Sequence, residues 1–255
     1  MPRTEIGAIV LAGGKSARFG RDKASVMLNG APMLQHVVSR VAQVASEVVV
    51  VKAKGQTLPQ VWPGVPLSVV EDMYLEAGPL GGLYTGFAAL DQDVALTVAC
   101  DMPLLQPALL GELVSLIEGH QAVVPMSDDG QPQPLCAVYS RETLKPILRR
   151  LRRKQLQLTG LLEDIDVLLV QPDHWRRFDP GGLSFMNANT EEAFAAVQAL
   201  ASAGAPPEAR RARCEVWYGS RRCREAATHR TEHSGVRVCG MHASIWGAVF
   251  EEVEE

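Results

Sequence analysis

A short segment rich in glycine and basic residues, LAGGKSARFGRDK, occupies residues 11–23 and follows an apolar run. Gly13 and Gly14 lack a Cβ atom, so the backbone there can approach a ligand closely. Successive backbone N–H groups in such a turn can form a concavity that binds anions. The cations that follow are Lys15, Arg18, Arg21 and Lys23, with Asp22 as the only acid among them. The segment therefore predicts a phosphate-binding loop, and the alternative is a solvated basic loop between a strand and a helix.

The spacing excludes the two commonest phosphate-binding motifs. A Walker P-loop has the pattern G-x-x-x-x-G-K-[ST], and residues 14–16 match its end, but Ile9 stands where its first glycine belongs. A dinucleotide-binding fingerprint needs G-x-G-x-x-G, a spacing that the glycines of this segment do not provide. The sequence therefore indicates a phosphate loop of another kind.

The elements that must position this loop alternate between short apolar runs and helical patterns. Apolar, β-rich runs predict strands at residues 6–11, 47–51, 67–72, 94–100, 122–126, 134–139 and 167–170. Of these, the runs at 47–51 and 67–72 have the composition of buried strands. Helical spacing and capping residues predict helices over these segments: residues 34–44, a segment starting near Pro79, and residues 107–118, 141–153 and 190–201, the last capped by Asn189 or Thr190. This alternation predicts a three-layer α/β fold with a mostly parallel sheet.

Ligands of such sheets bind at the carboxyl ends of the strands. Four positions follow predicted strands and are therefore the ones to inspect: Gly13 and the residues after it, Lys52, Asp72 and Asp101. A carboxylate at position 101 would emerge at the ligand edge. The alternative is that Asp101 caps the turn that follows it.

The pattern L-A-G-G-x-S-x-R-x-G-x-D-K at residues 11–23 resembles the opening motif of the molybdenum cofactor guanylyltransferases. Three further segments fit the family in order: EDMYLEAGPLGGLYTGF at 71–87, ACDMPLL at 99–105 and FMNANTEEAF at 185–194. The resemblance covers about residues 5–200. It implies a Rossmann-like fold of the nucleotide-diphospho-sugar transferase type.

The resemblance also implies a reaction. A phosphate oxygen of molybdopterin attacks the α-phosphorus of GTP, and pyrophosphate leaves. Because the nucleophile belongs to the substrate, the protein must position two anions and neutralise charge, which Mg²⁺ and several cations would do. One alternative is transfer of a cytidylyl or another nucleotidyl group to molybdopterin or another phosphorylated small molecule. A second is a non-catalytic adaptor for molybdopterin or a molybdoenzyme, which the intact Lys23 and Asp101 disfavour.

The resemblance assigns roles to individual residues. It makes Lys23, Arg18 and Asp101 the catalytic set, with Asp101 holding Mg²⁺. It predicts nucleotide contacts at Leu11, Ala12, Gly13, Gly14, Lys23, Lys52, Asp72 and Asp101, and contacts with the pterin substrate at Gly78, Pro79, Leu80, Gly81, Gly82, Asn187 and Asn189.

Three of these assignments have alternatives. Lys52 departs from the family, in which a neutral polar residue such as asparagine is expected, so a backbone contact or an added phosphate cation would replace the usual contact. Asp72 could be a surface residue of a turn. Asn189 could simply cap the following helix.

The composition of the chain changes after Ala201. A linker over 204–213 separates the predicted nucleotidyltransferase domain, 1–203, from a small module over 214–255. Cys214, Cys223, Cys239 and His242 have the spacing C-x8-C-x15-C-x2-H, which indicates a zinc site that would hold a small module together. The alternative is a metal-free tail with reduced cysteines. The module could contact a molybdoenzyme or a cofactor-insertion protein.

Composition limits the remaining possibilities. The net charge of −4 argues against a general nucleic-acid binder. No run of about 18 apolar residues predicts a membrane-spanning helix, and the absence of a secretory signal pattern predicts a cytoplasmic protein. Cys100 and Cys136 lie in apolar runs and are expected to be small buried side chains. The basic run 149–154 is expected to be a solvated helix face, with anionic pterin or a partner protein as the alternative ligand.

Overall fold

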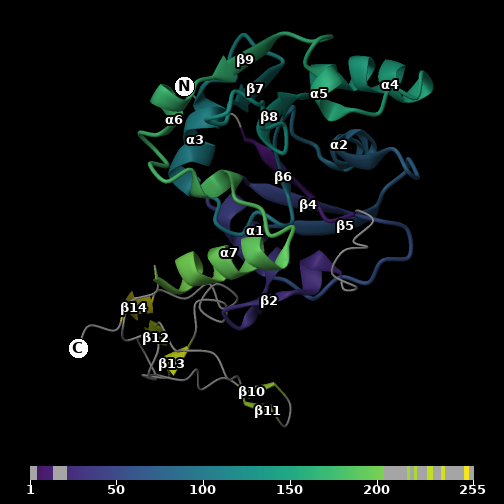
Figure 1. Cartoon of the computed structure of the whole chain (residues 1–255). Helices are drawn as coiled ribbons and strands as arrows, with labels where there is room; N and C mark the ends of the chain where they lie inside the picture. Colours follow the sequence, from purple (N-terminus) through teal and green to yellow (C-terminus); the bar gives the residue numbers. More distant parts are fainter. Residues whose placement is uncertain are drawn as a thin grey trace.

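The computed structural model describes residues 5–13 and 22–203, together with five short strands of the C-terminal part. Those strands are β10 (Trp217–Tyr218), paired with β11 (Arg221–Arg222), and β12 (His229–Thr231), paired with β13 (Arg237–Val238) and β14 (Phe250–Glu252). The predicted zinc ligands lie outside the described residues. The central feature is a seven-stranded sheet with helices on both faces (Figure 1).

The sheet has the strand order β5-β4-β1-β6-β8-β7-β9. In that order the strands are Leu67–Glu71, Glu47–Lys52, Gly7–Leu11, Val94–Ala99, Cys136–Ser140, Ala122–Pro125 and Val167–Val170. β8 runs antiparallel to both of its neighbours, and the other strands share one direction. The prediction of a mostly parallel sheet is confirmed. Leu11 pairs with Val51 of β4 and with Ala99 of β6, so these three strands end level at one edge.

Two helical layers cover the sheet. Alternate residues of a strand point to opposite faces, and in β1 both Ile9 and Val10 are fully buried. Val10 belongs to a core cluster with side chains of α1 (Met33–Val41), α3 (Pro107–Ser115) and α6 (Pro172–Trp175). Ile9 belongs to a second cluster with α2 (Gly78–Ala89), α4 (Leu144–Arg152) and α5 (Leu158–Leu161). The three-layer α/β architecture is therefore confirmed. No helix in the described part of the chain is long and apolar enough to span a membrane.

The edge where the parallel strands end carries the smaller elements. These are η1 (Lys23–Ser25) and the hairpin of β2 (Met27–Leu28) and β3 (Ala31–Pro32). η3 (Leu183–Phe185) precedes the last long helix, α7 (Glu191–Ala203). η2 (Arg141–Thr143) precedes α4 and lies at the opposite edge, because Ser140 before it pairs with Val94 at the start of β6. Val197 of α7 packs against Leu28 and Leu104. This contact brings the segment before α7 next to the ends of the parallel strands.

Several predicted boundaries differ from the structure. Residues 67–72 were expected to form a buried strand, but β5 is the edge strand and Val69 is 48% exposed because only β4 pairs with it. The helix predicted over 34–44 ends at Val41, where Val44 N bonds to the Val41 carbonyl in a tighter closing turn. The helix predicted over 107–118 ends at Ser115, and the one over 141–153 begins as the 3₁₀ turn η2.

The glycines of α2 have a packing reason. A Cβ atom on Gly86 would lie 2.4 Å from Ile9 Cγ2, and one on Gly82 would lie 2.8 Å from Leu11 Cδ2. These residues therefore allow α2 to lie directly on β1, which compensates for the poor helix propensity of glycine. Close packing on β1 places the N-terminus of α2 at the edge where that strand ends.

Candidate active site

Three side chains from distant parts of the chain meet at this edge. Lys23 Nζ lies 3.1 Å from Asp101 Oδ2 and also donates to Asn189 Oδ1. The side chain of Lys23 is 26% exposed and that of Asp101 is 13% exposed. Partial burial strengthens the ion pair relative to one in bulk water and leaves it reachable by a ligand. The structure thus brings together two residues of the predicted catalytic set and one of the predicted substrate set.

Asp101 is held by its backbone on two sides. It follows β6, where Met102 N bonds to the Ala99 carbonyl, and its own carbonyl accepts from Ala188 N at 2.9 Å. Within the described residues, the Asp101 carboxylate accepts from Lys23 and from no backbone N–H group. Its side chain is therefore not occupied in capping the following turn and remains available to a ligand.

Asn189 is likewise not used as a helix cap. Thr190 Oγ1 accepts from Ala193 N at 3.1 Å and so caps α7. Asn189 instead bonds to Lys23 through its oxygen and donates from Nδ2 to Asn187 Oδ1 at 2.7 Å. Both asparagines of the predicted substrate set therefore lie in one hydrogen-bonded chain with Lys23.

The described end of the predicted phosphate loop is anchored to β4. The N–H groups of Ala12 and Gly13 both donate to the Val51 carbonyl, at 2.8 and 3.2 Å. A Cβ atom on Gly13 would lie 3.0 Å from Ala53 N, so a residue larger than glycine would press on the neighbouring backbone. Leu11 is buried, whereas Gly13 is exposed at the strand end. Gly14 and Arg18 lie outside the described residues.

Two polar residues at this site have roles that the sequence analysis did not assign. Asp22 Oδ1 accepts from Ala24 N at 3.1 Å and caps η1, which begins at Lys23. Asp22 Oδ2 accepts from Gln56 Nε2 at 2.7 Å. The Asp-Lys pair was visible as a motif, but nothing in the sequence around Gln56 indicated that it reaches this loop.

Lys52 and Asp72 are each bound within their own neighbourhood. Lys52 Nζ lies 3.3 Å from Glu71 Oε1 of the adjacent strand and donates to the Gln56 carbonyl at 2.9 Å. Asp72 Oδ1 accepts from Tyr74 N and from Thr85 Oγ1, both at 2.9 Å. Each therefore has a structural partner within the protein, and the predicted nucleotide contacts of both remain predictions.

The predicted pterin segment divides into two parts. Leu80, Gly81 and Gly82 are buried under the first turns of α2, whereas Gly78 and Pro79 are exposed at its start. Gly78 has φ +61°, a conformation that favours glycine. The first N–H groups of an α-helix lack intrahelical partners and favour anions. Gly78 and Pro79 are thus the part of this segment that a substrate can reach.

Cys100 lies next to Asp101 but is not available as a nucleophile. Burial raises the pKa of the Cys100 thiol to about 12, so the thiol is neutral at physiological pH. Within the described residues, no group of three or more His, Cys, Asp and Glu side chains is arranged to hold a metal ion. A metal at Asp101 would need oxygen ligands from bound phosphates, which is the way Mg²⁺ is commonly held.

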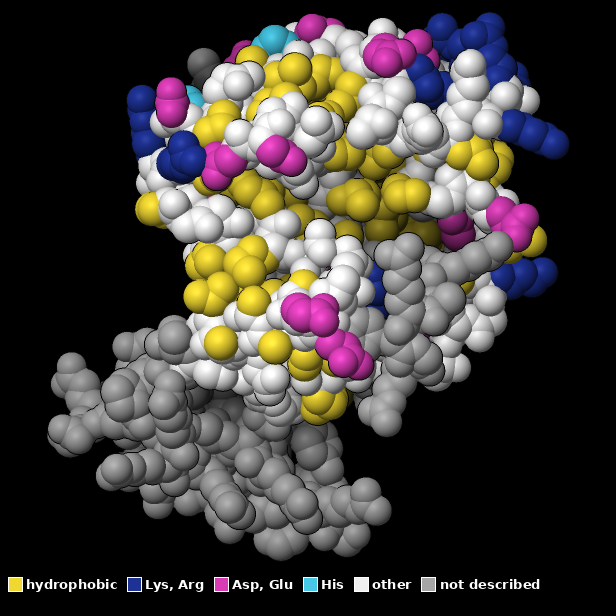
Figure 2. Space-filling view, viewed as in Figure 1, with side chains coloured by type: hydrophobic (Ala, Val, Ile, Leu, Met, Phe, Trp, Pro, Cys, Tyr) yellow, Lys and Arg dark blue, Asp and Glu magenta, His cyan; other side chains and the backbone are white. Residues whose placement is uncertain are grey.

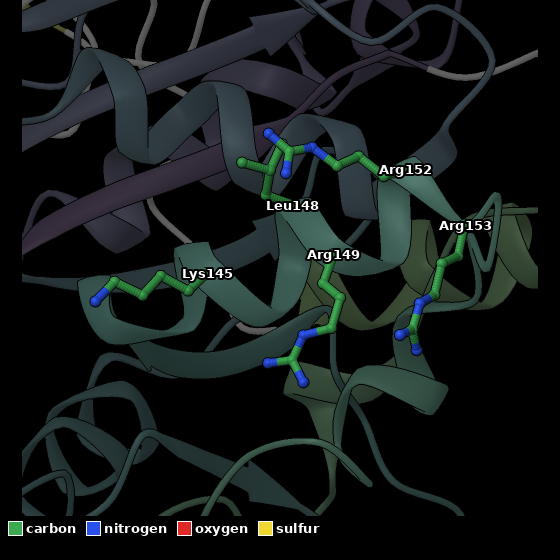
Figure 3. Close-up of a pocket in the computed structure, with 5 residues that line it drawn as sticks. All are labelled: Lys145, Leu148, Arg149, Arg152 and Arg153. Atoms are coloured by element: carbon green, nitrogen blue, oxygen red, sulfur yellow. The ribbon is translucent and has the colours of Figure 1, made fainter.

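A separate basic surface lies on α4. A shallow cavity of about 410 Å³ is lined by Lys145, Leu148, Arg149, Arg152 and Arg153, whose side chains extend in different directions (Figure 3). In the space-filling view, Lys and Arg side chains gather at the upper right, over α4 (Figure 2). Cations that do not converge on one point fit a solvated helix face and not a small-anion site, as predicted for residues 149 and 152–154. For Arg150 the prediction is wrong, because its side chain is buried and pairs with Asp164 at 2.6 Å.

Comparisons with known proteins identify the family. Residues 8–167 match the model of the MobA-like NTP transferase domain. A probable molybdenum cofactor guanylyltransferase of Chloroflexus aggregans is 34% identical over 196 residues, covering 75% of this chain and 92% of that protein. The molybdenum cofactor guanylyltransferase of Desulfosudis oleivorans is 33% identical over 198 residues, covering 77% of this chain and 96% of that protein. This chain belongs to the molybdenum cofactor guanylyltransferase family.

Solved structures agree with this guanylyltransferase assignment at the level of the fold. Molybdopterin-guanine dinucleotide biosynthesis protein A from Archaeoglobus fulgidus superposes with a TM-score of 0.65 at 22% identity, covering 77% of this chain and 99% of that one. The 2-C-methyl-D-erythritol 4-phosphate cytidylyltransferase of Thermus thermophilus gives 0.57 at 17% identity, covering 76% and 98%. The chain therefore shares its α/β fold with a nucleotidyltransferase that is named for another substrate, and it is itself a nucleotidyltransferase by family.

Proposed function

We propose that this protein transfers GMP from GTP to molybdopterin, with Mg²⁺, and releases pyrophosphate. A phosphate oxygen of molybdopterin forms a bond to the α-phosphorus of GTP, and the bond between the α-phosphorus and the bridging oxygen to the β-phosphate breaks. The product is the guanine dinucleotide form of the cofactor. The observation that best supports this proposal is the meeting of Lys23 and Asp101 at 3.1 Å at the edge of the sheet where β1 and β6 end.

The residues at this edge fit a magnesium ion held together with a nucleotide. The Asp101 carboxylate is a hard oxygen ligand, and within the described residues one of its two oxygens has no hydrogen-bond donor. Mg²⁺ bound there would neutralise charge on the phosphates. Lys23 would hold the triphosphate and stabilise the charge that develops on the leaving pyrophosphate, and we assign Arg18 to the same phosphates. Nucleotide contacts at Lys52 and Asp72 remain part of this proposal only as sequence-based predictions.

The choice of nucleotide is tested by measuring pyrophosphate release with Mg²⁺, molybdopterin cofactor and either GTP or CTP. We expect a higher kcat/KM with GTP. A higher value with CTP would replace the proposed activity by cytidylyl transfer, which the fold also accommodates. Failure to bind either nucleotide would favour a non-catalytic adaptor.

Asn189 is expected to support catalysis through Lys23. Asn189→Ala removes an acceptor from the Lys23 ammonium, and hydrogen bonds to charged groups contribute about 1.5–3 kcal/mol. If that contribution is made in the transition state, kcat/KM for GTP should fall about 10- to 100-fold. Steady-state pyrophosphate release measures this change.

Thr190 provides the matched control for Asn189. Thr190→Ala removes the cap of α7 and should lower the free energy of unfolding by about 1 kcal/mol, with kcat/KM close to that of the unchanged protein. Equal activity losses in the two variants would show that Asn189 acts through the fold of α7 and not through Lys23.

We also propose zinc binding by the module over 214–255, with Cys214, Cys223, Cys239 and His242 as ligands. Purified protein should then contain about one zinc per chain by elemental analysis, and Cys239→Ser should lose most of it. Protein purified without added chelator that contains no zinc would refute the site. A loss of zinc from Cys100→Ser instead would also do so, because that thiol is buried in the core.

A further inference from the structure

The side chain of Gln56, in the connection between β4 and β5, forms hydrogen bonds with both ends of the predicted phosphate loop. Gln56 Nε2 donates to the Ala12 carbonyl at 3.1 Å and to Asp22 Oδ2 at 2.7 Å. Ala12 precedes the Gly13 turn, and Asp22 is the residue immediately before Lys23. An amide nitrogen carries two hydrogens, and both are used here. One side chain therefore fixes the separation between the start and the end of the loop.

Gln56 is itself held in place by charged neighbours. It ends a turn in which its N–H group bonds to the Ala53 carbonyl at 3.1 Å, while its Oε1 accepts from Ala53 N at 2.8 Å. Gly55 has φ +71°, and its N–H donates to Glu71 Oε1 at 3.1 Å. Lys52 Nζ pairs with the same carboxylate oxygen and donates to the Gln56 carbonyl. The bonds from Gly55 and Lys52 lower the pKa of the Glu71 carboxyl, so it is ionised at neutral pH.

Asp22 connects Gln56 to the turn that carries Lys23. Asp22 uses one carboxylate oxygen for Gln56 and the other for Ala24 N, which starts the 3₁₀ turn η1 at Lys23. Lys23 then reaches Asp101 from that turn. Gln56 is half-buried and its side-chain hydrogen bonds go to polar groups of this loop and of its own turn. Its loss should therefore change the loop more than it changes the packing of the fold.

We propose that Gln56 is a positioning residue for the nucleotide: by bonding to Ala12 and Asp22 it holds Lys23 in the geometry that binds the triphosphate. Lys52, paired with Glu71, helps to hold Gln56 by donating to its carbonyl. This explains how lysine is accommodated where the family resemblance predicts a neutral polar residue. The proposal rests on the proposed function, since it names the nucleotide as the ligand that the positioned loop binds.

The first test compares Gln56→Ala with Gln43→Ala. Gln43 is a glutamine just after α1 whose amide donates to a carbonyl of its own segment, so its removal is a matched control. We expect Gln56→Ala to raise the dissociation constant for Mg-GTP and the KM for GTP about tenfold, with a smaller change in kcat. Isothermal titration calorimetry and pyrophosphate release measure both, and thermal unfolding verifies that the variants are folded. An affinity equal to that of Gln43→Ala would overturn the proposal.

The second test uses a pair exchange. Gln56→Glu places a carboxylate against Asp22 and removes the donor, so it should weaken GTP binding more than Gln56→Ala does. Adding Asp22→Asn supplies an amide donor to the new carboxylate at position 56 and retains an oxygen for Ala24 N, so the double variant should recover part of the lost affinity. The affinity lost in the double variant is compared with the sum of the losses in Gln56→Glu alone and Asp22→Asn alone. If the double variant loses that full sum, the two side chains act independently and the contact does not matter.

A third measurement needs no nucleotide and separates the two proposals. Hydrogen exchange of the Ala24 amide should be faster in Gln56→Ala than in the unchanged protein, because the Asp22 cap is no longer held. If the unchanged protein fails to bind GTP, the proposed function is wrong, while this exchange rate still decides whether Gln56 holds the Asp22 cap in front of Lys23. Unchanged exchange at Ala24 in Gln56→Ala would refute the positioning role by itself.

Discussion

Replacing Lys23 with alanine is expected to lower the turnover number for pyrophosphate release by about 10²- to 10³-fold, the usual cost of removing one preorganised charge-stabilising group. Lys23 is placed by η1 and held between Asp101 and Asn189 before any ligand arrives. Its ammonium group therefore needs little reorganisation to meet the phosphates. Steady-state kinetics at saturating GTP and Mg²⁺ would measure the loss.

Two further variants test whether the loss in Lys23→Ala comes from the ammonium group at this position. Lys23→Arg keeps the charge but replaces a compact ammonium with a planar fork, so an intermediate loss is expected. Lys145→Ala removes a lysine of the separate basic surface on α4 and should leave turnover unchanged. Turnover of Lys23→Ala within a factor of about two of the unchanged protein would remove Lys23 from the mechanism, since a single hydrogen bond to a charged group is worth more than that.

Asp101→Asn is expected to have the second large effect. The amide keeps the shape of the side chain and an acceptor for Lys23, but it removes the negative charge that would hold Mg²⁺. We expect turnover to fall at least about a hundredfold, because metal stabilisation of phosphoryl charge is worth several kcal/mol. The Mg²⁺ concentration for half-maximal activity should rise as well, which a titration of pyrophosphate release against Mg²⁺ would show.

Asp93 offers the control for this change. Its side chain is 86% exposed and pairs with Arg141 before the start of β6, so Asp93→Asn removes an aspartate charge from the opposite end of the same strand without touching Lys23. Its Mg²⁺ dependence should match that of the unchanged protein. An Asp101→Asn variant with that same dependence would contradict the assignment of Asp101 as the metal ligand.

The sheet could be predicted because its strands carry a strong local signal. A run such as residues 47–51 is apolar without alternation, which is the pattern of a strand covered on both faces, and β4 is buried through its centre. The exposure of Val69 could not be predicted in the same way. Whether an apolar strand is central or at an edge depends on which strands pair with it, and that is decided by the order of the whole sheet.

Parts of the site could also be predicted. The carboxyl ends of parallel strands share one edge, so Gly13, Lys52 and Asp101 could be placed near one another from strand positions alone. The role of Asn189 was left open, because an asparagine before a helix is as suitable for capping as for binding. In the folded chain Thr190 caps the helix, and Asn189 accepts a hydrogen bond from Lys23 instead.

The sequence by itself determined the α/β alternation, the family motifs and the residue types of the site, because apolar periodicity and short motifs are properties of neighbouring positions. Only the tertiary structure decided that Lys23, Asp101 and Asn189 share hydrogen bonds and that Gln56 joins Ala12 to Asp22. These contacts cross up to 166 positions of sequence, and each depends on the direction of a polar side chain. That direction follows from the packing of elements around it and leaves no periodic pattern in the chain.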